Sequence, residues 1–161
     1  MEILQILVPL LVIALFIYRQ TKTYRTDRPS ALYVAGAMIV LSFVAGGLVD
    51  PAHLALSLAL LVAEVVSALG LAAWRAATVR VWLDGEGTAW TKATGWTLLA
   101  WLVSIAVRAG LYFAGDSLGV TVSTGGLLLF VGLTLGAQAY LIIRRGRLLT
   151  GATARPGTVV R

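Results

Sequence analysis

Two ionisable side chains of opposite charge, Glu64 and Arg108, lie inside long apolar runs of the sequence. An isolated charge at the centre of a membrane-spanning helix costs about 3 kcal/mol, so such groups are usually paired or functional. We expect the two side chains to interact directly or through a water. The pair is either a site for a proton, an ion or an anionic ligand, or a structural contact that fixes the register of two helices. Snorkelling of Arg108 toward Asp116 is a third interpretation.

Several other chemistries lack the residues that they need. The chain has no cysteine, which excludes disulfides, thiol chemistry and cysteine-ligated metals. His53 is the single histidine, so the chain cannot form a multi-histidine metal site or a bis-histidine haem site. No phosphate-binding glycine loop and no nucleophile–base set is visible. We therefore predict no metal, no cofactor and no catalytic residue, and an enzyme is the less favoured interpretation.

The elements that must position Glu64 and Arg108 are long and apolar. Hydrophobic residues make up 59% of the 161-residue chain and charged residues 12%, whereas soluble domains carry about 25% charged residues. A membrane crossing needs roughly 20 apolar residues, and continuous runs favour helices over the alternating strands of a barrel. We predict an all-α transmembrane bundle of five helices in a single domain, residues 1–147, followed by a flexible tail over 148–161. The helices are expected over residues 3–18, 31–49, 54–74, 95–113 and 123–143.

Basic residues gather in three regions that five crossings place on one side of the membrane. Twelve of the 13 lysines and arginines lie there, and Arg108 is the exception. The positive-inside rule then puts the N-terminus outside and the C-terminus in the cytoplasm. Contact with anionic lipid headgroups accounts for these charges, so we expect the lipid bilayer as a partner and no nucleic acid. The twelve residues are Arg19, Lys22, Arg25, Arg28, Arg75, Arg80, Lys92, Arg144, Arg145, Arg147, Arg155 and Arg161.

The longest polar connection predicts a short cytoplasmic β-hairpin between the third and fourth helices. Residues 78–92 alternate apolar and polar side chains around Asp84-Gly85. Asp-Gly favours the positive φ angles of a type I′ turn. A two-stranded hairpin is marginally stable alone, so it is either a packed connector or a docking surface for a partner.

Small residues recur at helical spacing in the fourth and fifth predicted helices. Ala106 and Gly110 form one small-xxx-small pair, and Gly132 and Gly136 form another. Such pairs allow two helix backbones to approach closely. They either pack the bundle internally or join it to another subunit.

Residues 74–82 (WRAATVRVW), followed by Asp84-Gly85 and by residues 101–108 (WLVSIAVR), resemble the CcdC-like family of small bacterial membrane proteins. The resemblance implies a multi-pass protein of the bacterial cytoplasmic (inner) membrane, and it supplies no reaction. We expect a structural or accessory membrane protein that forms a homo-oligomer or joins a larger complex. The alternative is a small transporter or channel that uses Glu64 and Arg108.

Overall fold

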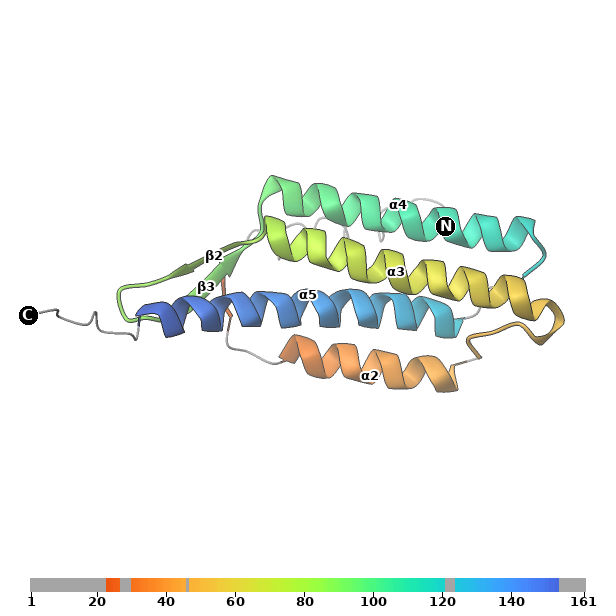
Figure 1. Ribbon diagram of the computed structural model, residues 1–161, viewed down its shortest axis with the longest axis horizontal. Coiled ribbons are helices and arrows are strands. Elements are labelled where there is room, and N and C mark those ends of the chain that lie inside the picture. Colours follow the sequence, from red (N-terminus) through yellow and green to blue (C-terminus); the bar gives the residue numbers. More distant parts are fainter. Residues whose placement is uncertain (1–22, 27–29, 46, 121–123, 154–161) are drawn as a thin grey trace, which may run out of the picture.

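Within the described residues, four helices lie side by side and a small sheet closes one end of the molecule (Figure 1). This computed structural model describes residues 23–26, 30–45, 47–120 and 124–153. The helix predicted over residues 3–18 therefore lies outside the described part of the chain.

Three of the helices have the length and composition of membrane spans. The helices are α2 (Ser30–Val44), α3 (Leu54–Thr78), α4 (Gly95–Ser117) and α5 (Thr124–Thr153). α3, α4 and α5 are long and apolar enough to cross a membrane, whereas α2 has 15 residues. By helix length and hydropathy, the chain is a multi-pass membrane protein.

The helix ends differ from the predicted ones because an apolar run does not mark where backbone hydrogen bonding stops. α2 ends at Val44 instead of residue 49, ahead of Gly47, whose φ of +77° lies in the region that glycine tolerates best. α3 continues past residue 74 to Thr78, and α5 continues past residue 143 to Thr153. Residues 148–153, which we predicted to be part of a flexible tail, are therefore helical.

The sheet contains the predicted hairpin and one further strand. Its strands are β1 (Tyr24–Arg25), β2 (Arg80–Leu83) and β3 (Ala89–Lys92), which pair antiparallel in the order β1-β3-β2. The hairpin predicted over residues 78–92 is formed by β2 and β3, whereas β1 was not predicted. We call this end of the molecule the sheet end, and the opposite end, where the short helix Pro51–His53 precedes α3, the far end (Figure 1).

The turn of this hairpin is not the type I′ turn predicted at Asp84-Gly85. Asp84 pairs with Thr88 through a backbone hydrogen bond of 3.0 Å, and the positive φ falls on Gly87, at +77°. The Asp84 carboxylate also accepts a hydrogen bond from the backbone N–H of Thr88, at 2.8 Å. These bonds stabilise a longer turn whose left-handed position is the second glycine.

α5 lies at the centre of the bundle and packs against both α2 and α3, while α4 packs on α3. The α5 backbone approaches α2 closely at two glycines of the predicted packing motif. A methyl group added at Gly132 would lie 2.9 Å from Cγ1 of Ile39, and one added at Gly136 would lie 3.2 Å from Cβ of Ala35. Gly132 and Gly136 therefore face the interior of the bundle.

Candidate functional site

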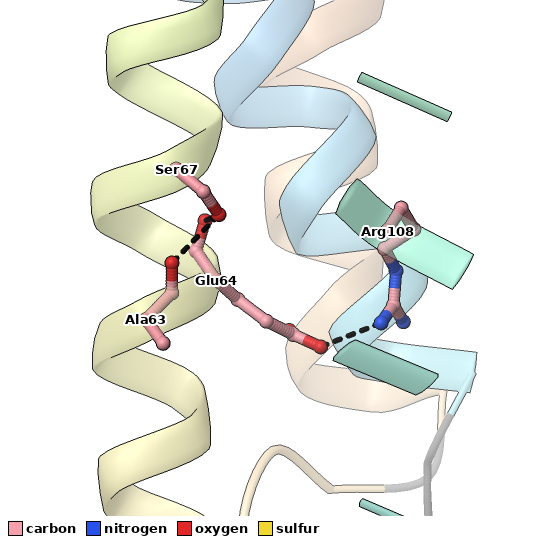
Figure 2. Close-up of polar contacts among 4 residues, drawn as sticks. All are labelled: Ala63, Glu64, Ser67 and Arg108. Carbon is pink, nitrogen blue, oxygen red and sulfur yellow. Dashed lines mark hydrogen bonds and ion pairs between the residues drawn. The ribbon is translucent and has the colours of Figure 1, made fainter. Parts of the chain in front are cut away.

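An ion pair joins α3 and α4 inside the bundle (Figure 2). Nη1 of Arg108 donates a hydrogen bond of 2.6 Å to Oε1 of Glu64, and the two side chains are only 12% and 13% exposed. In Figure 2 the Glu64 side chain extends away from α3 toward the guanidinium. Of the expected interactions, direct or through a water, the structure has the direct one, and Arg108 turns toward Glu64 instead of Asp116.

A second arginine, Arg75, is completely buried near the sheet end of α3. Its Nη1 donates a hydrogen bond of 2.7 Å to Oγ of Ser104, and its guanidinium carbon lies 4.1 Å from the centroid of a Trp101 ring. Nε and Nη2 have no hydrogen-bond partner in the described part of the chain. Arginine stays protonated in proteins, so a full positive charge is buried here with several N–H groups unused.

Both arginines line one cavity of about 550 Å³ between α4 and α5, which we call the main cavity. Small-molecule sites typically enclose roughly 300–1,000 Å³, so this volume can hold an organic ligand. Most of the wall is apolar or aromatic, and Glu64 is not part of it. Apart from the aromatic residues, the side chains with charged or hydroxyl groups in the wall are Arg75, Ser104, Arg108, Thr124 and Thr134.

The main cavity is lined by two positively charged side chains, Arg75 and Arg108, at neighbouring depths along α4. Trp101, Ser104 and Arg108 lie on one face of α4 because they are spaced i, i+3 and i+7. Ser104, which holds Arg75, and Arg108 are separated by about 6 Å along the helix axis. Glu64 compensates the charge of Arg108, whereas no carboxylate among the described residues pairs with Arg75. Guanidinium groups match the oxygens of carboxylates and phosphates, so the arrangement can bind an anion.

The other pair of small residues, Ala106 and Gly110, lies on an exposed face of α4. A methyl group added at Gly110 would meet nothing within 4 Å. These two residues are therefore not used in packing between described helices, in contrast to Gly132 and Gly136. In the part of the chain that the structure describes, no group of three or more His, Asp or Glu side chains could hold a metal ion.

Sequence reasoning missed the burial of Arg75 because the apolar run ends one residue before it. The signal that could have found it is helical periodicity. Ala68, Ala72, Arg75 and Ala76 are all buried in α3 at the spacing i, i+4, i+7 and i+8. Arg75 also follows Glu64 by three helical turns, so the two side chains share one face of α3.

Comparisons with known proteins identify no relative of this chain. No family model, no curated protein and no solved structure matches it. The resemblance to the CcdC-like family stays a prediction, and the function has to be argued from the site.

Proposed function

We propose that this protein binds an anionic amphiphile inside the membrane, in the main cavity. The single observation that carries the proposal is the complete burial of Arg75 in the wall of that cavity, where no described residue pairs with its Nε or Nη2. A charge in the membrane interior costs about 3 kcal/mol or more when it has no partner. A bound anion removes this cost because it supplies the missing acceptors.

The composition of the cavity wall selects the class of ligand. Two guanidinium groups favour an oxyanion such as a phosphate or a carboxylate. Apolar walls that include Ile105, Leu127 and Phe130 favour an aliphatic chain attached to that anion. A small hydrated anion would lose its water in such a cavity without any apolar gain. The oxyanion is supplied either by a free single-chain amphiphile or by the headgroup of an anionic lipid.

Glu64 acts in this proposal as a positioning residue. It holds Arg108 across the helix interface by the 2.6 Å hydrogen bond and does not line the cavity. Of the three ligands considered for the Glu64 and Arg108 pair, a proton, an ion or an anionic ligand, the geometry therefore favours the anionic ligand. In this proposal Arg75 makes the principal contact with it.

The orientation belongs to the same proposal. Arg80 of β2, Lys92 of β3 and Arg145 of α5 lie at or beside the sheet end. By the positive-inside rule we place the sheet end in the cytoplasm and the protein in the bacterial cytoplasmic membrane.

Native mass spectrometry of the delipidated protein in a neutral detergent tests the binding. The probes are phosphatidylglycerol and decyl phosphate, with phosphatidylcholine and inorganic phosphate as comparisons. We expect phosphatidylglycerol or decyl phosphate to bind at least tenfold more tightly to the wild type than to Arg75→Gln. Arg80→Gln is the matched control, because it removes the same charge from an exposed position.

A thermal measurement separates loss of binding from loss of folding. A ligand that binds only the native state stabilises it by RT ln(1 + L/Kd), where L is the free ligand concentration, so it raises the melting temperature once its concentration exceeds Kd. The anionic amphiphile should raise the Tm of the wild type and of Arg80→Gln and leave that of folded Arg75→Gln unchanged. Equal binding by wild type and Arg75→Gln, or no binding of either amphiphile to the wild type, would refute the proposal.

A second candidate function, a structural or accessory protein, is favoured by the exposed face of α4 at Ala106 and Gly110. Small residues in lipid allow another helix to approach closely, from a second copy or a larger complex. Mass photometry in mild detergent tests this candidate. A strictly monomeric particle with no partner, unchanged by Gly110→Leu, would count against it.

A further inference from the structure

A second cavity of about 220 Å³ lies beside the main cavity, nearer the sheet end. It is lined by α5 residues from Leu135 to Ile143, whereas the main cavity uses α5 residues from Thr124 to Thr134. The two cavities therefore follow one another along α5. Apart from Trp101, the side chains with polar groups that line the second cavity are Arg25, Thr26, Thr91 and Gln138.

Trp101 lines both cavities and so stands between them. The guanidinium of Arg75 lies against its ring, 4.1 Å from the centroid. Cation–π attraction of this kind strengthens when the two groups are desolvated, as Arg75 is here. The indole is therefore in contact with the same arginine that has no anionic partner among the described residues.

Each cavity contains buried polar atoms that no described residue satisfies. Nε and Nη2 of Arg75 have no partner in the main cavity. Oγ1 of Thr26 and Oε1 of Gln138 have none in the second cavity. Unpaired buried polar groups destabilise a protein unless a ligand or a water pairs with them. Side chains with unsatisfied buried polar atoms thus lie in the walls on both sides of Trp101.

The two cavities together match the depth of a bilayer. Between residues 124 and 143, α5 rises roughly 30 Å at the usual rise per residue, and the hydrocarbon core of a bilayer is about as thick. The row formed by the main cavity, Trp101 and the second cavity thus covers the whole depth of the membrane interior.

We propose that the protein moves the headgroup of an anionic lipid across the membrane along this row, with Trp101 as the partition between two half-sites. This inference rests on the proposed function, because the headgroup must first bind at Arg75. Binding of an anion neutralises the guanidinium and weakens its attraction to the indole, which removes one of the contacts that hold Trp101 between the half-sites. The acyl chains stay in the surrounding bilayer at the side between α4 and α5.

A dithionite assay on phosphatidylcholine liposomes that contain the full chain tests this transfer. Trace phosphatidylglycerol with an NBD-labelled chain reports the exposed leaflet, because dithionite quenches only the label that it can reach. We expect the protected fluorescence to decay several-fold faster in liposomes with wild-type protein than in protein-free liposomes. NBD-labelled phosphatidylcholine should decay more slowly than the phosphatidylglycerol.

Variants of Trp101 and Arg75 test whether the transfer of lipid depends on these two residues. Trp101→Ala should speed the decay several-fold over the wild type, and Arg75→Gln should return it to the protein-free rate. Trp96→Ala is the control, because Trp96 is 66% exposed on α4 and lines neither cavity. If Trp101→Ala does not fold, Trp101→Leu opens the same position with a smaller loss of apolar surface, and the wild-type rate remains decisive.

The possible failures are distinguishable. Phosphatidylglycerol that binds in native mass spectra but is not moved by the wild type or by Trp101→Ala would overturn the route and leave the binding site standing. Absence of binding would overturn both. A wild-type rate equal to that of Arg75→Gln would overturn the role of the main cavity in transfer. Release of trapped inorganic phosphate, without movement of lipid, would assign the route to a free anion and overturn its assignment to a headgroup.

Discussion

Glu64 pairs with Arg108 of the neighbouring helix, whereas Arg75, three turns along the same face of α3, has no carboxylate partner among the described residues. The described interior of the bundle therefore holds two guanidinium groups and one carboxylate. Glu64 and Arg108 form a contact between helices, and Arg75 provides the charge that a ligand can satisfy.

Removal of the Glu64 charge should destabilise the bundle. Glu64→Gln leaves Arg108 buried without its carboxylate, and loss of one partner of a buried ion pair costs about 3–5 kcal/mol. We expect the free energy of unfolding, measured by denaturant titration in mixed micelles, to fall by that order. The double variant Glu64→Gln/Arg108→Gln should lose clearly less than the sum of the two single losses. Glu86→Gln in the exposed turn is the control, and additive losses would show that the pair is not coupled.

Two glycine-to-alanine changes should have opposite effects on stability. A methyl group at Gly125 would lie 2.5 Å from the backbone oxygen of Ser42 and 2.7 Å from that of Gly47, so α2 and α5 would have to separate. We expect Gly125→Ala to cost about 1–3 kcal/mol. Gly110→Ala meets open space and should gain about 0.5–1 kcal/mol, because glycine weakens a helix interior. The same unfolding titration measures both, and equal effects would contradict the close approach at Gly125.

Asp84 should make the hairpin sensitive to acid. It accepts hydrogen bonds from the indole of Trp90 and from the backbone N–H of Thr88, each at 2.8 Å, and these hold the pKa of Asp84 below its ordinary value. Because the pKa is lower in the folded state than in the unfolded state, ionised Asp84 stabilises the hairpin above the unfolded pKa. This stabilisation is lost as the pH falls through the folded pKa.

The indole N–H resonance of Trp90 measures this titration directly. We expect it to shift with a midpoint below about pH 3.9, the ordinary pKa of aspartate. The shift should disappear in Asp84→Asn and persist in Glu86→Gln. A midpoint at or above the ordinary value would contradict the hydrogen bonds as its cause.

Hydropathy and helical rise predicted the parts of the fold that depend on local composition. The runs at 54–74 and 95–113 each lie within one observed helix, and residues 124–143 of the third run lie within α5, because a segment surrounded by lipid must be continuously apolar. The rise per residue also placed Glu64 and Arg108 at similar depths, and two long side chains cover the remaining difference.

Features that depend on contacts between distant residues could not be predicted from local composition. β1 consists of only two residues and exists because β3 pairs with it. The turn depends on the side chain of Asp84, which selects Gly87 as the left-handed position. Arg75 carries the charge typical of a loop, and only its periodic relation to Ala68 and Ala72 shows that it faces the interior.

The pairing of β1 with β3 constrains how the chain is threaded through the bilayer. Hydrogen-bonded strands share one aqueous compartment, so the segment between β1 and β2 must cross the membrane an even number of times. α3 is long enough for one crossing, and among the described residues of this segment α2 is the remaining apolar helix that could provide the other. The 15 residues of α2 rise about 22 Å, less than the usual hydrocarbon thickness of about 30 Å. A span this short is accommodated by a thinner bilayer, by snorkelling of its flanking residues or by oligomerisation, so α2 is where we expect the protein and the bilayer to adjust to one another.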